Sequence, residues 1–187
     1  MSKRLSKLVL AAAVVGAMAL TATTSALASN VTATATVTAG TLTLSTSATP
    51  SVSSTLDGTD QTPSYTLPMT VNDYTGSGNG WNVTITSTTF STGGGSPHLL
   101  STSASTATAV SSSCNGGTCT APSNAIGYPL AVPAGSSAPT AVKLFNAAAA
   151  SGMGGFTVTP TVQVAIPANT YAGTYTSTVT VAVVSGP

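Results

Sequence analysis

The side chains that could carry acid–base chemistry are few and scattered along the chain. The sequence holds three aspartates (Asp57, Asp60 and Asp73), one histidine (His98) and no glutamate. A serine-hydrolase site would have to join Asp73 to His98, and no G-x-S-x-G motif accompanies them. Paired carboxylates for glycoside cleavage would have to come from the three aspartates, which fall in or beside predicted loops. The sequence therefore predicts a protein that is not an enzyme.

Cys114 and Cys119 are the only cysteines, and they lie in the short motif CNGGTC. In an oxidising compartment, two cysteines this close predict a local disulfide. The closed loop is short, so the bond is worth about 2 kcal/mol by chain-entropy reasoning. Free thiols are the alternative. A metal site would need further ligands, and His98 is distant, so the sequence predicts neither a metal nor another cofactor.

The motif LDGTDQ at residues 56–61 has the composition of a turn. Asp57-Gly58 offers the positive backbone dihedrals that a tight turn requires. Two aspartates this close could also hold Ca²⁺. That ion prefers six or more oxygen ligands, however, and no third carboxylate lies nearby in the sequence. We therefore predict a turn here.

The first 28 residues are typical of a secretory signal peptide. Three basic residues precede an uncharged run at residues 8–20, and Ala-Leu-Ala at residues 26–28 fits the small-x-small cleavage rule. A run of this length is too short to span a bilayer of about 30 Å. We expect cleavage before Ser29, which leaves residues 29–187 as one secreted, extracellular domain without a membrane span.

The predicted mature chain is nearly uncharged. Lys143 is its single basic residue against three aspartates, which gives a formal charge of −2. Nucleic acids and anionic lipids are bound by clustered lysines and arginines. The charge balance therefore excludes nucleic-acid binding and a polybasic membrane role.

Serine, threonine, alanine, glycine and valine dominate the rest of the sequence and favour strands over helices. A disordered low-complexity chain is the alternative reading of such a composition. Apolar residues nevertheless alternate with polar ones in separate stretches, and this period of two predicts strands. The stretches are residues 30–38, 65–71, 81–86, 156–166 and 174–184, and residues 126–132 offer another short strand. We expect an all-β, antiparallel, immunoglobulin-like β-sandwich with at most one short helical turn, near residues 147–150.

Residues 71–90 are the most specific stretch of the sequence, because they hold its only tryptophan. Three glycines between residues 76 and 80 permit a sharp turn before Trp81 opens an alternating strand. A single tryptophan at the start of a sandwich strand predicts a core anchor. An exposed platform for a sugar or a protein partner is the alternative. Pro160, within the stretch 156–166, predicts a bend or an edge position there.

Residues 56–83 resemble the first half of a WxL domain, a surface module of Gram-positive bacteria, and the resemblance as a whole covers roughly residues 31–187. The similar runs are LDG at residues 56–58, VND at 71–73, GWNV at 80–83, and the C-terminal stretch from IP at 166–167 to Pro187. The first motif reads Trp81-Asn82-Val83 in this chain. The second motif, which carries a tryptophan in the family, reads Val181-Ala182-Val183.

The resemblance implies a β-sandwich that associates non-covalently with peptidoglycan or another wall polymer, sometimes together with other surface proteins. It implies that the two motif strands form the binding surface. The candidate binding residues are then Trp81, Val83, Tyr175, Val181 and Val183.

Two other non-catalytic functions stay open. Uncharged Thr/Val strands lack the charges that block edge pairing, which favours self-association into an extracellular filament or surface layer. A carbohydrate-binding adhesion module is the second, with Trp81 and tyrosines such as Tyr65, Tyr74 and Tyr128 as stacking surfaces.

Overall fold

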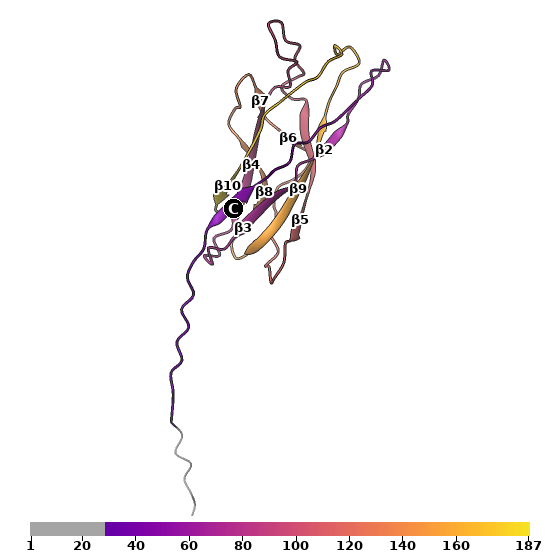
Figure 1. Cartoon of the computed structure of the whole chain (residues 1–187). Helices are drawn as coiled ribbons and strands as arrows, with labels where there is room; N and C mark the ends of the chain where they lie inside the picture. The colour runs from indigo at the N-terminus through magenta and orange to yellow at the C-terminus, as the bar shows by residue number, and fades with distance from the viewer. Residues whose placement is uncertain (1–28) are drawn as a thin grey trace, which may run out of the picture. The chain divides into compact units, whose positions relative to one another are not determined.

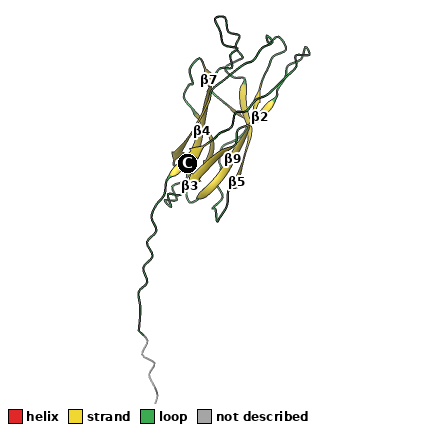
Figure 2. Ribbon diagram, viewed as in Figure 1, coloured by secondary structure: helices red, strands yellow, loops and turns green. Residues whose placement is uncertain are grey.

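A computed structural model describes residues 29–187, and the predicted signal peptide lies outside the described residues. The described residues form ten strands and no helix (Figures 1 and 2). The strands are β1 (Leu42–Ser45), β2 (Ser64–Thr66), β3 (Met69–Asp73), β4 (Trp81–Thr88), β5 (Ser105–Cys114), β6 (Leu130–Ala131), β7 (Ala134–Gly135), β8 (Val142–Ala147), β9 (Gly154–Val164) and β10 (Val179–Ser185).

The strands form two sheets that pack face to face. The first has the order β1-β3-β9-β5-β6, and β2 pairs with the second half of β9 beyond the end of β3. The second has the order β10-β4-β7, and β8 pairs with the first half of β4. Every pairing is antiparallel except the two-residue contact of β4 with β7. The predicted all-β sandwich is confirmed.

The core lies between the sheets and includes the fully buried Trp81 at the start of β4. The Trp81 ring lies 5.9 Å, between centroids, from Phe145 of β8 in its own sheet. It lies 6.4 Å from Phe156 of β9 in the facing sheet. Both distances suit tilted aromatic packing, so this one side chain links the two layers.

The glycine loop between β3 and β4 crosses from one sheet to the other. Gly76, Gly78 and Gly80 all have positive φ angles, between 64° and 73°. Gly80 also lies against the backbone at the end of β8, where a Cβ would collide with the carbonyl of Ala147. Only glycine combines both properties without strain, so the predicted sharp turn is confirmed.

The predicted turn at residues 56–61 is also present. The Asp57 carboxylate accepts hydrogen bonds from the Thr59 N–H at 2.9 Å and from the Thr59 hydroxyl at 2.7 Å. The stretch 147–150 instead ends β8 in a non-helical turn that places Ala150 at a φ of 61°. The short helical turn allowed by the sequence does not form there.

The strand predicted at residues 30–38 is wrong. Residues 29–41 belong to no strand, and Val31 and Val37 are 89% and 93% exposed. The alternation is present in the sequence, but a strand needs a neighbour that accepts its backbone hydrogen bonds. Pairing begins only at Leu42, opposite Asp73.

Of the two positions predicted for Pro160, a bend or an edge, the edge position is wrong, because β9 lies inside its sheet. Pro160 pairs with Val110 of β5 on one side, and its carbonyl accepts a hydrogen bond from the Leu67 N–H on the other. The side of Pro160 that lacks an N–H therefore faces the gap between β2 and β3. No strand that the structure describes there needs a hydrogen-bond donor from β9. The break between two short partner strands is what accommodates this proline.

Candidate functional site

The two motif strands suggested by the sequence lie side by side. β4 and β10 pair antiparallel over their whole shared length, which places Val83 opposite Val183 and Trp81 opposite Ser185. They are neighbours although about a hundred residues separate them in the chain.

The side chains of the first motif are buried. Trp81 and Val83 are both 0% exposed, and the Trp81 indole N–H donates a 2.8 Å hydrogen bond to the carbonyl of Gly152. A buried tryptophan with a satisfied N–H has the properties of a core anchor. Trp81 therefore offers no exposed ring to a ligand.

The remaining three candidates lie nearer the surface. Val181 and Val183 are half-buried on the inner face of β10 and pack against the core. Tyr175 precedes β10, and its hydroxyl donates a 2.9 Å hydrogen bond to the carbonyl of Tyr171. The five candidates thus do not form a common exposed surface.

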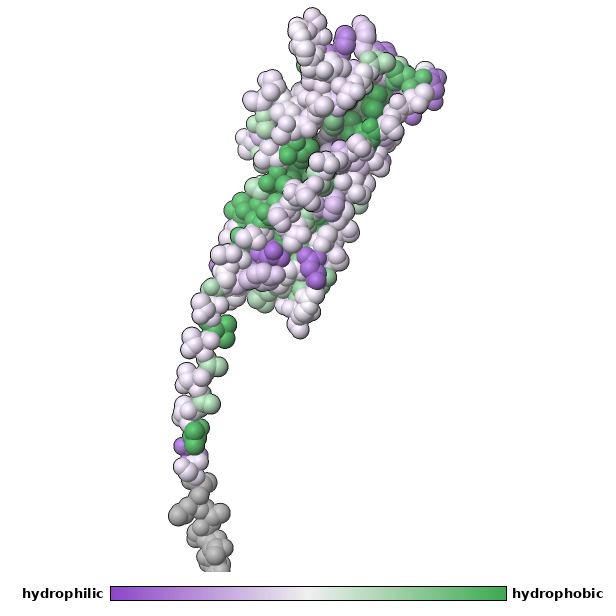
Figure 3. Space-filling model, in the orientation of Figure 1, coloured by the Kyte–Doolittle hydropathy of each residue, from purple (hydrophilic) through white to green (hydrophobic). Residues whose placement is uncertain are grey.

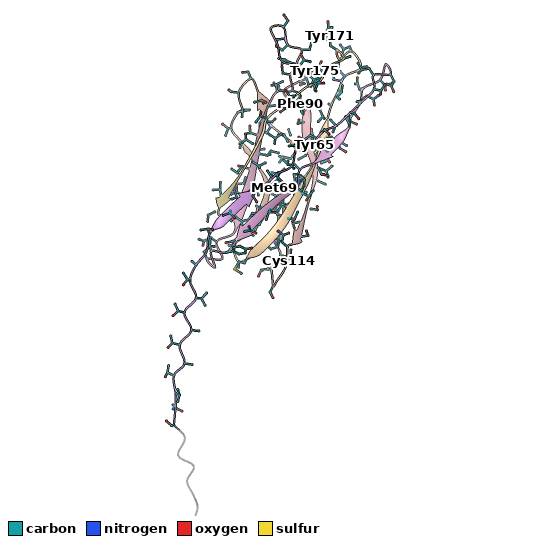
Figure 4. The ribbon with its side chains drawn as sticks, in the orientation of Figure 1. Tyr65, Met69, Phe90, Cys114, Tyr171 and Tyr175 are labelled. Atoms are coloured by element: carbon teal, nitrogen blue, oxygen red, sulfur yellow. A yellow bond between two sulfur atoms is a disulfide. The ribbon has the colours of Figure 1, made fainter. Side chains whose placement is uncertain are left out.

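Tyr175 belongs instead to an open cavity at one end of the sandwich, called here the aromatic groove. Its volume is about 460 Å³. Its apolar and aromatic lining includes Phe90, Leu100, Val164, Ile166, Tyr171 and Tyr175. Figure 4 shows Tyr171, Tyr175 and Phe90 close together at the end of the molecule opposite Cys114. Of these residues, the sequence identified only Tyr175.

Tyr171 forms the exposed rim of the aromatic groove. It is 65% exposed, and its ring stacks on the imidazole of His98 with a centroid separation of 3.8 Å and an interplanar angle of 11°. Leu99, beside His98 in the sequence, is 61% exposed. An exposed aromatic ring that is fixed in orientation by stacking on a second ring is suited to stacking against a ligand.

A second cavity continues from the aromatic groove along β10 and is called here the seam. Its volume is about 510 Å³, and it shares Phe90 and Tyr175 with the aromatic groove. Its lining includes Tyr65, Leu67, Val179 and Val181 together with residues 48–52. Hydrophobic surface runs in a band along this face of the molecule (Figure 3).

The electrostatics of both cavities are neutral. Among the described residues, none that lines the aromatic groove or the seam is an acid, a lysine or an arginine. Burial raises the pKa of the Tyr65 hydroxyl above its ordinary value, so this side chain stays uncharged well into the alkaline range. Such cavities can bind by stacking, apolar contact and hydroxyl hydrogen bonds.

The acidic side chains line neither cavity: Asp57 and Asp73 accept hydrogen bonds within their own loops, and Asp60 accepts one from a segment distant in the sequence. Asp60 accepts a hydrogen bond from the Ala168 N–H, and Asp73 accepts two from Thr75. A hydrogen bond from the Thr59 side chain, followed by one from its N–H, lowers the pKa of Asp57. Within residues 29–187, no three potential metal ligands of the His, Cys, Asp or Glu types gather in one place.

No protein family, curated protein or solved structure matches this chain. The geometry of the groove and the resemblance of the motifs are therefore the grounds for any function.

The predicted disulfide is present between Cys114 and Cys119. It closes the loop that follows β5 and lies away from the aromatic groove (Figure 4). Disulfides persist in oxidising surroundings, which is consistent with a location outside the cell. Within the described part of the chain, no helix is both long and apolar enough to cross a membrane.

Proposed function

We propose that this chain is a secreted, non-catalytic surface domain that associates non-covalently with peptidoglycan through the aromatic groove. The observation that carries the proposal is the exposed Tyr171 ring, stacked on His98 at the rim of a neutral, apolar cavity. The C–H faces of sugar rings pack on aromatic rings, and peptidoglycan presents long runs of sugars.

The polar groups around the groove suit a sugar better than a purely apolar ligand. Thr170 and Thr174 line it together with Ser53 and Ser54. Their hydroxyls can donate to and accept from sugar hydroxyls, whereas a charged ligand would find no opposite charge there. The predicted signal peptide, the disulfide and the resemblance to WxL domains support a location at the wall.

The proposal moves the binding surface from the motif strands to the groove. Trp81 and Val83 have no exposed surface with which to bind, so their role is to hold β4 in the core. Tyr175 is the one residue shared by the motif-based candidates and the groove.

Sedimentation of the chain beginning at Ser29 with purified insoluble peptidoglycan tests the proposal. We expect the unmodified chain to sediment with the polymer. Tyr171→Ala should weaken binding about five- to tenfold, because it removes the exposed stacking ring.

Tyr74→Ala is the matched control for this experiment. Tyr74 is also an exposed tyrosine, at 58%, but it lies in the loop after β3 and lines neither cavity. We expect it to bind as the unmodified chain does. Recovery of the unmodified chain entirely in the supernatant would overturn wall association, and equal binding by Tyr171→Ala would overturn the groove as its site.

A further inference from the structure

The outer edge of β10 has a row of backbone groups without a partner among the described residues. The Thr88 N–H donates to the Thr178 carbonyl, and the Gly186 N–H donates to the Gly80 carbonyl. Backbone groups alternate in direction along an antiparallel strand, so the even-numbered residues from 178 to 186 face β4. The N–H and C=O groups of Val179, Val181 and Val183 therefore point away from the sheet.

β10 also lacks the usual protection of an edge strand against pairing. It runs for seven residues with no charge and no proline. By contrast, β1 has four residues, and β2 has three between Pro63 and Pro68. The unpaired end of β5 is exposed, serine-rich and closed by the disulfide. Short edge strands and prolines discourage the addition of another strand, and β10 is neither short nor interrupted by proline.

The seam gives a further strand somewhere to place its side chains. It runs along β10, where Val179, Val181, Tyr65 and Leu67 share about 510 Å³ of largely apolar space with residues 48–52. A strand added beyond β10 would direct every second side chain into this space.

Residues 31–38 have the length and pattern of such a strand. The sequence VTATATVT places Val31, Ala33, Ala35 and Val37 on one face, and eight residues match the seven of β10. The segment carries no charge and belongs to no strand in this structure. The sequence predicts that the apolar face of residues 31–38 packs in a sheet. In the part of the chain that the structure describes, that face contacts no partner strand.

We propose that residues 31–38 of one copy add as a strand to the outer edge of β10 in a second copy, with their apolar face in its seam. Each copy both donates a segment and accepts one. The contact is therefore heterologous, and it continues from copy to copy as a linear chain. This inference goes beyond wall association and does not depend on it.

Light scattering after size exclusion and negative-stain electron microscopy test the proposal on the chain beginning at Ser29, without peptidoglycan. We expect concentration-dependent linear assemblies. The double variant Ala33→Asp/Ala35→Asp should raise the concentration needed for assembly by about tenfold or more, because it would bury carboxylates in the seam.

Thr32→Asp/Thr34→Asp is the matched control, because it adds the same charge to the opposite face of the same segment. We expect it to assemble as the unmodified chain does. All four positions lie outside the strands, so none of these substitutions removes a contact of the fold. A strictly monomeric unmodified chain, or equal behaviour of the two double variants, would overturn the proposal.

Hydrogen exchange locates the acceptor edge in the same samples. The amides of Val179, Val181 and Val183 should exchange slowly in the assembly and rapidly in the monomeric Ala33→Asp/Ala35→Asp variant. Rapid exchange of these amides in assembled material would show that another surface joins the copies.

Discussion

Trp81 and Tyr171 differ in how far their roles can be predicted from the residues next to them in the sequence. The role of Trp81 could be predicted from its neighbours, because a glycine turn and an alternating strand surround it. Tyr171 acquires its role from His98, which belongs to a distant loop. No spacing in the sequence relates those two rings, so the rim of the groove could not have been found without the structure.

Tyr128 is a residue at which stability should depend on pH. Its hydroxyl donates a 2.6 Å hydrogen bond to the carbonyl of Leu144. Burial raises the Tyr128 pKa, and a hydrogen bond from Asn124 offsets part of that effect. Between the ordinary pKa of about 10 and the raised value, the unfolded chain loses this proton while the folded chain keeps it. The free energy of unfolding should therefore fall as the pH rises through that range.

Tyr128→Phe should separate the two contributions of this hydroxyl. At pH 7 the variant should lose about 1 kcal/mol of stability, because the hydrogen bond to Leu144 is removed. Above pH 10 its decline should be shallower than that of the unmodified chain, since one ionising group is gone. Urea unfolding between pH 7 and pH 11 measures both. An equally steep decline in the variant would show that other groups control the alkaline loss.

At the scale of elements, the glycine loop before β4 allows a paired substitution. Gly78 and Gly80 have similar positive φ angles, 66° and 73°, but only Gly80 lies against neighbouring backbone. Gly78→Ala should cost about 1–2 kcal/mol, which is the price of a left-handed conformation alone. Gly80→Ala should cost more than about 3 kcal/mol, because its methyl group would also collide with the end of β8.

Urea unfolding of the two glycine variants provides the measurement. Near-equal losses would mean that the backbone beside Gly80 moves aside easily and does not hold the loop in place. The two variants share one loop and one chemical change, so a difference between them reports the collision.

Strands in which large apolar residues alternate with polar ones could be predicted from the sequence. β3, β4, β9 and β10 could be located by alternating valine, isoleucine, phenylalanine and methionine. β5 could not, although it pairs with β9 along almost its whole length. Its buried positions are filled by Ser105 and Ala107, which bring little hydrophobic contrast. In β5, the long pairing with β9 specifies the strand more strongly than its own pattern does.

At the scale of the whole molecule, the sandwich was predictable but its cavities were not. Alternating strands without helices leave two packed sheets as the natural way to bury one face of each. The aromatic groove, by contrast, is built from residues 52–56, 90–100 and 164–175, three segments that are far apart in the chain. Only the order of strands within the sheets brings these segments together.

The pairing of β4 with β10 also determines how much of the chain must be present before folding can finish. β9 is the central strand of one sheet, and β10 flanks β4 in the other, so neither sheet can close before the last quarter of the chain is available. Such non-local pairing gives a high contact order, and we expect refolding to take longer than about a millisecond. Stopped-flow fluorescence of Trp81 measures the rate, and submillisecond burial of Trp81 would contradict this expectation. A chain with this topology reaches its final form only after its C-terminal strands have been made.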